Sequence, residues 1–345
     1  MQSSHSLPRN PLAKLIAQRL RAAKERLAKE LFVHKTDLSV FAAKLGPLPS
    51  DPAAAPNLDY EEVAAGDVFG PPGGGWMQRW FKLAISKAEP HEVGRRVLFW
   101  ECQGETTVYI DGRPWAGLDV AHDYCPLPDG ECTLYLDTGT YQTGIWANKP
   151  GISKHTGCVF EAASIRLRNK EAWDVYHDFA VLVDLLLLEL SDRDFDPPRG
   201  PGFTEPLPPL PARVRRLLYD LDKVVDWLDR REYGAAGTLL KRIYEKNNGR
   251  SGDGKAGLLG HAHIDLVWLW PEVVTYHKGV HTFANTLRLL DAYPEFVFNQ
   301  SSPFLYRKLE AISPQLMEEV RRQIARGRWE VTGGFTVEAD VTVPT

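Results

Sequence analysis

The sequence has few cysteines and no excess of positive charge. Four cysteines occur in 345 residues, none of them in a Cys-x-x-Cys pair, so we expect reduced core cysteines of a cytoplasmic protein. Cys125 and Cys132 bracket a turn and could pair under oxidising conditions. Lysine and arginine number 41 against 45 acidic residues, a net charge of −4. This balance argues against nucleic acid and against an anionic membrane as partners.

Long apolar runs are also missing. The most apolar run, residues 179–190, is interrupted by Asp184 and is too short to span a bilayer. The N-terminal sequence MQSSHSLPRNPLAKL lacks the apolar core of a signal peptide. Hydrophobic residues make up 43% and charged residues 25%, which is an ordinary globular balance for two or three domains.

The first half of the chain carries a helical pattern followed by β-type patterns. Residues 12–31 have apolar residues at helical spacing, and a Pro- and Ala-rich connector follows at residues 47–56. Short strand-like runs from about residue 77 to 167 predict an antiparallel β-sandwich, with a hairpin at Asp111-Gly112. Its tryptophans could stack on sugars, but core packing is their commoner role. They are Trp76, Trp80, Trp100, Trp115 and Trp146.

Helical periodicity resumes at about residue 170, with a Pro-rich break at residues 197–211. The Gly-rich stretch 247–257 is the main predicted boundary. We therefore divide the chain into an N-terminal helical segment and linker (1–56), a β-sandwich accessory domain (57–170), a helical linker region (171–250) and an α/β region (251–345).

The α/β region alternates strands and helices. Strands are expected at residues 256–261, 296–302 and 328–340, with helices at 272–290 and 303–326, the second ending at Gly327. Two such β-α-β units predict parallel strands, whose carboxyl ends form binding sites. Each of these strands ends in polar residues. They are His261, His263 and Asp265, then Asn299, Gln300 and Ser301, then Glu338 and Asp340.

These strand ends offer ligands for a metal ion. Alternate residues of an extended segment share a side, so His263 and Asp265 could supply nitrogen and oxygen to zinc, with Asp340 alongside. The alternative is a purely structural role, in which His263 and Asp265 cap a strand end and the following helix. Glu338 and Asp340 would then be an ordinary solvated pair.

Three motifs carry a family resemblance. GHAHIDLVWLWP (260–271), TFANTLRLLDAYPEFVFNQSSPFLY (282–306) and GRWEVTGGFTVEAD (327–340) resemble the start of the catalytic domain of the glycoside hydrolase family 38 α-mannosidases. The match covers the last quarter of the chain, and the regions before it resemble the accessory region of bacterial and cytosolic members. The resemblance implies a (β/α)7 barrel, of which residues 251–345 would be an incomplete start. It also implies retaining removal of terminal α-mannosyl residues from glycans or oligosaccharides.

The resemblance also implies roles for particular residues. His263, Asp265 and Asp340 would bind zinc, or a similar divalent ion, and Asp340 would also be the nucleophile. The zinc would hold two adjacent hydroxyls of the α-mannoside substrate. Trp268 or Trp270 could form an apolar substrate-binding platform, and core packing is the alternative for either.

The sequence departs from the family pattern in two places. Residues 333–336 read GGFT, where the family has tryptophan two residues after the Gly-Gly pair. Residues 341–345 read VTVPT, where the family has asparagine and then Pro-Gly-Glu-Ser. The family's acid/base carboxylate and last histidine ligand have no counterpart here. We therefore expect a fragment of a longer chain or a natural truncation, inactive by itself.

Two other functions stay open at this point. In a metal-dependent amidohydrolase, His261 and His263 would both bind the metal. In a carbohydrate-binding or scaffolding module, the β-sandwich would be the working part and the barrel a non-catalytic remnant. A homo-oligomer is compatible with either.

Overall fold

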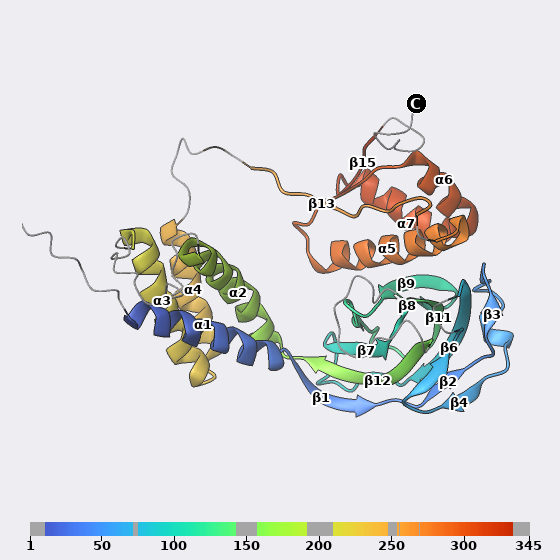
Figure 1. The fold of residues 1–345 in the computed structure, drawn as a ribbon, viewed down its shortest axis with the longest axis horizontal. Helices are drawn as coiled ribbons and strands as arrows, with labels where there is room; N and C mark the ends of the chain where they lie inside the picture. The colour runs from blue at the N-terminus through green and yellow to red at the C-terminus, as the bar shows by residue number, and fades with distance from the viewer. Residues whose placement is uncertain are drawn as a thin grey trace, which may run out of the picture. The chain divides into compact units, whose positions relative to one another are not determined.

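The computed structural model describes residues 11–71, 75–142, 157–191, 210–247, 254, 256–268 and 270–333. The chain divides into two compact units, and most of their elements are labelled in Figure 1. One unit comprises Met1–Val33 and Leu167–Gly254, and the other His34–Arg166 and Lys255–Thr345. These units cut across the predicted divisions, because the first helix groups with the later helices while residues 34–56 group with the sheets.

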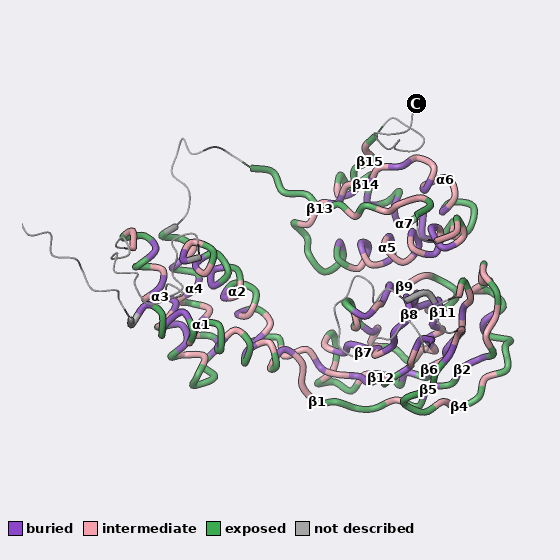
Figure 2. The backbone as a smooth tube through the Cα atoms, in the orientation of Figure 1, coloured by how far each residue is buried: buried purple, intermediate pink, exposed green. Residues whose placement is uncertain are grey.

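The helical unit contains α1 (Pro11–Lys29), α2 (Lys170–Ser191), α3 (Ala212–Asp229) and α4 (Tyr233–Asn247). Their apolar faces share one core, in which Leu20, Phe179, Leu221 and Leu240 are fully buried. Figure 2 shows the buried stripe along each helix in purple. The predicted amphipathic helix is confirmed, and the apolar run 179–190 is part of α2. No helix among the described residues has the length and apolar character needed to cross a membrane.

Two arginines of α1, Arg19 and Arg26, pair with acidic side chains of α3. Arg19 donates hydrogen bonds to Asp222 at 2.7 Å, to Asp226 at 2.8 Å and to Asp229 at 2.9 Å. The pKa of Arg19 is raised, first of all by the hydrogen bond to Asp226. Within this unit, Arg19 therefore attaches α1 to α3, and Lys24 attaches α1 to α2 through an ion pair with Asp184 at 2.5 Å.

The second unit contains two antiparallel sheets. One sheet has the strand order β4-β2-β6-β11-β8-β9, with β3 also paired to β6, and the other has the order β1-β12-β7-β10, with β5 paired to β12. The strands are β1 (Phe32–Asp37), β2 (Val40–Ala42), β3 (Gly46–Pro47), β4 (Glu61–Val63), β5 (Asp67–Phe69), β6 (Met77–Ile85), β7 (Arg96–Cys102), β8 (Gly104–Ile110), β9 (Arg113–Leu118), β10 (Tyr124–Pro126), β11 (Cys132–Gln142) and β12 (Cys158–Arg168).

The two sheets share one hydrophobic core, as the predicted sandwich requires. Trp100 of β7 lies between Phe81 of β6 and Phe160 of β12, with ring centroids 5.1 Å apart in both pairs. Trp80 is buried as well, whereas Trp76 is exposed. Trp146 lies outside the described residues. Trp80 and Trp100 thus serve mainly to fill the core.

The hairpin predicted at Asp111-Gly112 is confirmed between β8 and β9. Asp111 has φ 51° and Gly112 has φ 71°, the two positive values of a type I′ turn. All four cysteines are free thiols. Burial raises the pKa of Cys125 to about 12, which disfavours its reactive thiolate form.

Residues 32–47 were expected in the N-terminal helical segment and linker, but they contain strands β1, β2 and β3. The last two are three residues and two residues long, and the last four residues of β1 are exposed. Such strands show too little alternation to be recognised from sequence, because their pairing partners supply the order.

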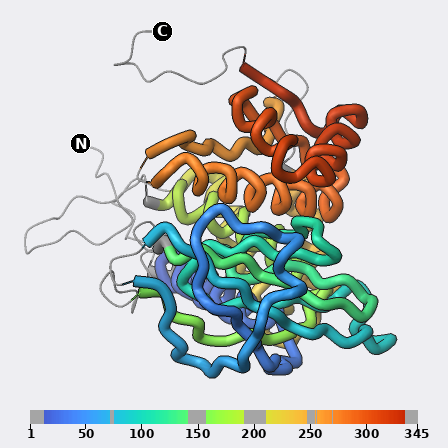
Figure 3. Tube along the Cα trace, turned by 90° about the vertical axis from the view of Figure 1, so that its right-hand side faces the viewer, coloured from blue at the N-terminus to red at the C-terminus, as the bar shows by residue number. Residues whose placement is uncertain are grey.

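The remaining part of this unit has three parallel strands, β13 (Gly260–His261), β14 (Phe298–Gln300) and β15 (Trp329–Val331), in that order. The helices α5 (Glu272–Ala292), α6 (Pro303–Ile312) and α7 (Pro314–Ala325) connect them. Figure 3 shows these helices, in orange to red, packed together. The parallel pairing is confirmed, although three short strands do not establish a barrel.

The single helix predicted over residues 303–326 is wrong, because the helix breaks at Ser313. Pro314 disfavours helical geometry in the residue before it, and Ser313 has φ −145° and ψ 68°. The predicted end at Gly327 is confirmed. Its φ is 69°, its N–H donates to the carbonyl of Ile324 at 2.9 Å, and the next N–H, of Arg328, donates to Gln323 at 3.0 Å. This is a Schellman cap.

Candidate active site

The segment after β13 brings His263 and Asp265 together. Nε2 of His263 lies 3.2 Å from Oδ1 of Asp265. The side chains are 64% and 44% exposed, so both remain accessible from solvent. The extended backbone beyond β13 places alternate side chains on one side, which is the arrangement that the His-x-Asp spacing predicted.

His261 is placed differently. Its Nδ1 lies 3.0 Å from the backbone oxygen of Asn299 in β14. A carbonyl oxygen can only accept a hydrogen bond, so Nδ1 carries the proton in this contact. His261 therefore links two neighbouring parallel strands, which is a structural role.

The third predicted ligand, Asp340, lies outside the described residues, as does Glu338. Within the described ranges, no three side chains of histidine, cysteine, aspartate or glutamate converge as a metal site would require. His263 and Asp265 nevertheless fit two positions of a zinc site. Ligand atoms about 2.0–2.1 Å from a tetrahedral zinc lie roughly 3.3 Å apart, close to the observed 3.2 Å.

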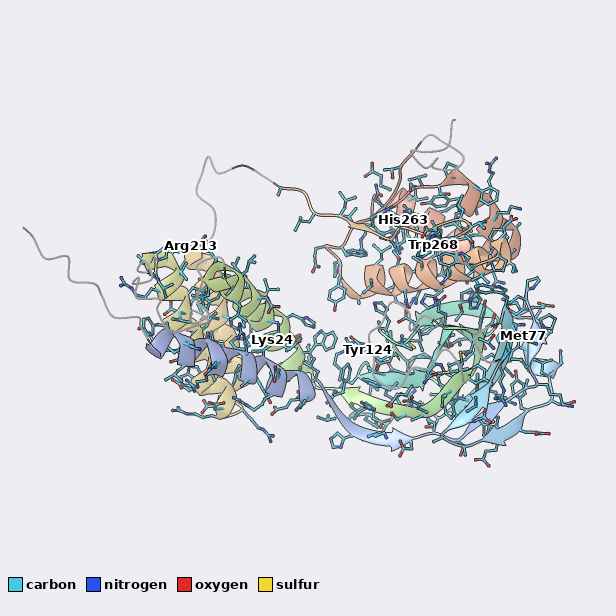
Figure 4. The ribbon with its side chains drawn as sticks, in the orientation of Figure 1. Lys24, Met77, Tyr124, Arg213, His263 and Trp268 are labelled. Atoms are coloured by element: carbon cyan, nitrogen blue, oxygen red, sulfur yellow. The ribbon has the colours of Figure 1, made fainter. Side chains whose placement is uncertain are left out.

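Two tryptophans follow the histidine–aspartate pair. Trp268 is half exposed, and its ring meets that of Trp270 edge-on at 5.6 Å. Figure 4 labels His263 and Trp268, which both come from the segment between β13 and α5. Trp270 is fixed by a 3.0 Å hydrogen bond from Nε1 to Oγ1 of Thr275. Half of the surface of Trp268 is thus exposed, whereas Trp270 is held by its neighbours.

The end of β14 has an unusual backbone that the sequence did not indicate. Ser302 has φ 71° and ψ 81°, a left-handed conformation that is uncommon for serine. Its buried Oγ and the buried Oε1 of Gln300 have no hydrogen-bond partner among the described atoms. Unpaired buried polar atoms are costly, and strained backbone conformations such as that of Ser302 concentrate at functional positions. Gln300 was predicted at this edge, whereas Ser302 was missed because no sequence signal encodes its φ.

Tyr306 supports this strand end from α6. Its hydroxyl donates to the carbonyl of Gln300 at 3.1 Å and accepts from Nε1 of Trp329 at 2.8 Å. Burial raises the pKa of Tyr306 to about 12, so it remains a neutral donor at physiological pH. The carboxyl end of β14 is therefore held rigidly by neutral hydrogen bonds.

A cavity of about 280 Å³ lies between the antiparallel sheet region and α5. It is bordered by residues 48–53, Tyr109, the N-terminal half of α5 and the junction of α6 with α7. None of the predicted site residues lines it. The described part of the candidate site is accordingly an open strand edge.

The carboxyl ends of parallel strands are where α/β folds bind ligands, and here the segment after β13 presents a histidine–aspartate pair and an exposed tryptophan. Residues 253–345 match the family "Glycosyl hydrolases family 38 N-terminal domain". The chain is 26% identical over 337 residues to Alpha-mannosidase 2C1 of Homo sapiens. This alignment covers 92% of this chain and 30% of the human protein.

Two further relatives agree. Alpha-mannosidase G of Dictyostelium discoideum is 24% identical over 307 residues, which covers 83% of this chain and 26% of the relative. The Alpha-mannosidase of Saccharomyces cerevisiae is 24% identical over 313 residues, with 83% and 27% coverage. The chain therefore spans less than a third of the length of these relatives. The matches confirm the predicted resemblance to the glycoside hydrolase family 38 α-mannosidases.

Proposed function

We propose that this chain supplies part of the active site of a zinc-dependent retaining α-mannosidase that removes terminal α-mannosyl residues from glycans or oligosaccharides. The observation that carries the proposal is the His263–Asp265 pair, 3.2 Å apart within the family-matching region. The names of the relatives support the substrate class. Four free thiols support the proposed cytoplasmic location.

The proposed roles follow from donor chemistry. His263, Asp265 and Asp340 would hold the metal, which when bound supplies a Lewis acid that orients sugar hydroxyls. The carboxylate of Asp340 attacks the anomeric carbon and forms a glycosyl-enzyme. Water later attacks the same carbon and releases the sugar, which restores the starting configuration. The exposed face of Trp268 packs against the apolar side of the sugar ring. The departing oxygen needs a proton from an acid that we assign to no residue of this chain.

The first test is hydrolysis of an aryl α-mannoside by the purified polypeptide 1–345 in the presence of zinc. We expect no turnover, since both proton transfers lack their carboxyl group. Robust hydrolysis would refute this. In an active polypeptide that contains the segment, Asp340→Asn should abolish turnover and leave the fold intact. Glu338→Gln is the matched control, and equal losses in both variants would remove the nucleophile assignment.

The carbohydrate-binding module is the second candidate. Trp76 is the described sandwich tryptophan with the largest exposed surface, at 44%, and offers the stacking face that such a module needs. Titration with mannose oligosaccharides distinguishes the two functions. Binding that persists after metal removal and in Asp340→Asn, but is lost in Trp76→Ala, favours the module.

A further inference from the structure

Lys278 of α5 lies between the larger antiparallel sheet, which contains β8, and the candidate site. Its Nζ donates a hydrogen bond to Oε1 of Glu105 in β8, and the same nitrogen lies 4.6 Å from the centroid of the Trp270 ring. The side chains of Lys278 and Glu105 are only 18% and 8% exposed. Both contacts are therefore shielded from water. Ion pairs and cation–π contacts are stronger at such a shielded position than at an exposed surface.

The other side of Trp270 is joined to the chain next to Asp265. The indole N–H of Trp270 donates to Thr275, and the fully buried hydroxyl of Thr275 donates to the carbonyl of Leu266. Leu266 directly follows Asp265. The contacts therefore continue from Glu105 through Lys278, Trp270 and Thr275 to the residue after the candidate metal ligand.

The helix that carries Lys278 is firmly attached to the sheet. Asn285 makes hydrogen bonds of 2.9 and 2.8 Å with the backbone of Gly117 in β9. Nε2 of His277 lies 3.2 Å from Oδ2 of Asp137 in β11, with both side chains buried. Lys278 is therefore held in place on a fixed helix, unlike a mobile surface lysine.

We propose that Glu105 and Lys278 are positioning residues, through which the β-sheet region sets the orientation of Trp270 and of its neighbour Trp268 at the candidate site. The sheet would then be part of the substrate-binding apparatus. The part of this proposal that concerns a bound sugar rests on the proposed function. The coupling of Glu105 to Trp270 needs neither sugar nor metal.

The test uses ¹⁹F NMR of the 345-residue chain labelled with 5-fluorotryptophan, which has ten tryptophans. Trp270→Phe and Trp268→Phe assign the two signals. In the double variant Glu105→Gln/Lys278→Met, both charges are removed together, so no buried charge is left unpaired and the fold is retained. We expect the Trp270 signal to shift or broaden and the Trp268 signal to follow.

Two further variants make the result specific. Lys278→Arg keeps a cation between the carboxylate and the ring and should leave the Trp270 signal close to its wild-type position. Lys82→Met removes a cation 5.7 Å from the Tyr60 ring, elsewhere in the sheet, and should leave both signals unchanged. A wild-type Trp270 signal in the folded double variant would overturn the proposal.

Addition of methyl α-mannoside then tests the sugar separately. A wild-type response of Trp268 that is lost in the double variant supports positioning for the substrate. If the wild type gives no response while the double variant still shifts Trp270, positioning for the sugar is refuted in this chain and the coupling stands, and the Asp340→Asn experiment decides the proposed function separately.

Discussion

The side-chain amide of Asn285 pairs with both backbone groups of Gly117, accepting from its N–H at 2.9 Å and donating to its carbonyl at 2.8 Å. Gly117 belongs to β9, the edge strand of the larger sheet. An edge strand presents unpaired backbone groups, and this amide satisfies two of them. A side chain of the parallel α/β region thereby attaches that region to the antiparallel sheet.

Asn285→Ala should therefore destabilise the protein. The substitution leaves the backbone groups of Gly117 without their partner, which costs about 1–3 kcal/mol. The free energy of unfolding in urea measures the loss. Asn57→Ala, at an exposed position, is the control and should change it by less than about 0.5 kcal/mol. Equal losses in the two variants would contradict the role of the amide.

Gly117→Ala should be harmful for a steric reason. A Cβ atom at this position would lie 2.1 Å from Cδ2 of His281, far inside van der Waals contact. We expect a loss of about 1–3 kcal/mol, as for other overpacked sites. Gly130→Ala is the matched control, since a Cβ there meets nothing within 4 Å. A neutral Gly117→Ala variant would show that α5 does not pack this closely on β9.

His281 should make stability depend on pH below about 6.5. Burial lowers its pKa to about 3, so the folded protein keeps the ring neutral while the unfolded chain takes up a proton. The unfolded state then binds more protons, and stability falls as pH decreases from 6.5 toward 3. The contribution of this one group approaches about 1.4 kcal/mol per pH unit.

Urea unfolding between pH 4 and pH 6 measures this slope. His281→Phe should flatten it, whereas His91→Gln, at an exposed position, should not. Burial disfavours the charged form of the nearby His277, but the carboxylate of Asp137 outweighs this and raises its pKa. The stability from His277 is present below pH 6.5 and is lost as pH rises through its folded pKa, so the two histidines act in different ranges. An unchanged slope in His281→Phe would exclude this origin.

Metal binding separates the proposed ligands from His261. His263→Ala and Asp265→Ala should each weaken zinc binding by about tenfold or more, because each removes a ligand atom. His261→Ala should have a smaller effect, since its ring contacts the Asn299 carbonyl. Competition with a chromophoric chelator measures the affinities. The reverse order, with His261 essential and Asp265 dispensable, would favour the amidohydrolase alternative.

Much of the local structure was predictable because its signals lie close together in the chain. The apolar spacing of α1, the positive-φ turn at Asp111-Gly112 and the glycine cap of α7 each depend on a few neighbouring residues. The proximity of His263 and Asp265 follows from alternation along an extended segment. The break at Ser313 was also encoded locally, by Pro314, and was missed because apolar periodicity continues across it.

The sequence by itself determined the short-range features: the helix faces, the hairpin, the parallel order of three strands and the His-x-Asp pair. Only the tertiary structure decided which faces meet. Glu105 and Lys278 are 173 positions apart, and nothing in either neighbourhood identifies the other as its partner. Such pairs arise because the packing of α5 on the sheet excludes water and brings opposite charges from distant parts of the chain together, a condition that no local pattern contains.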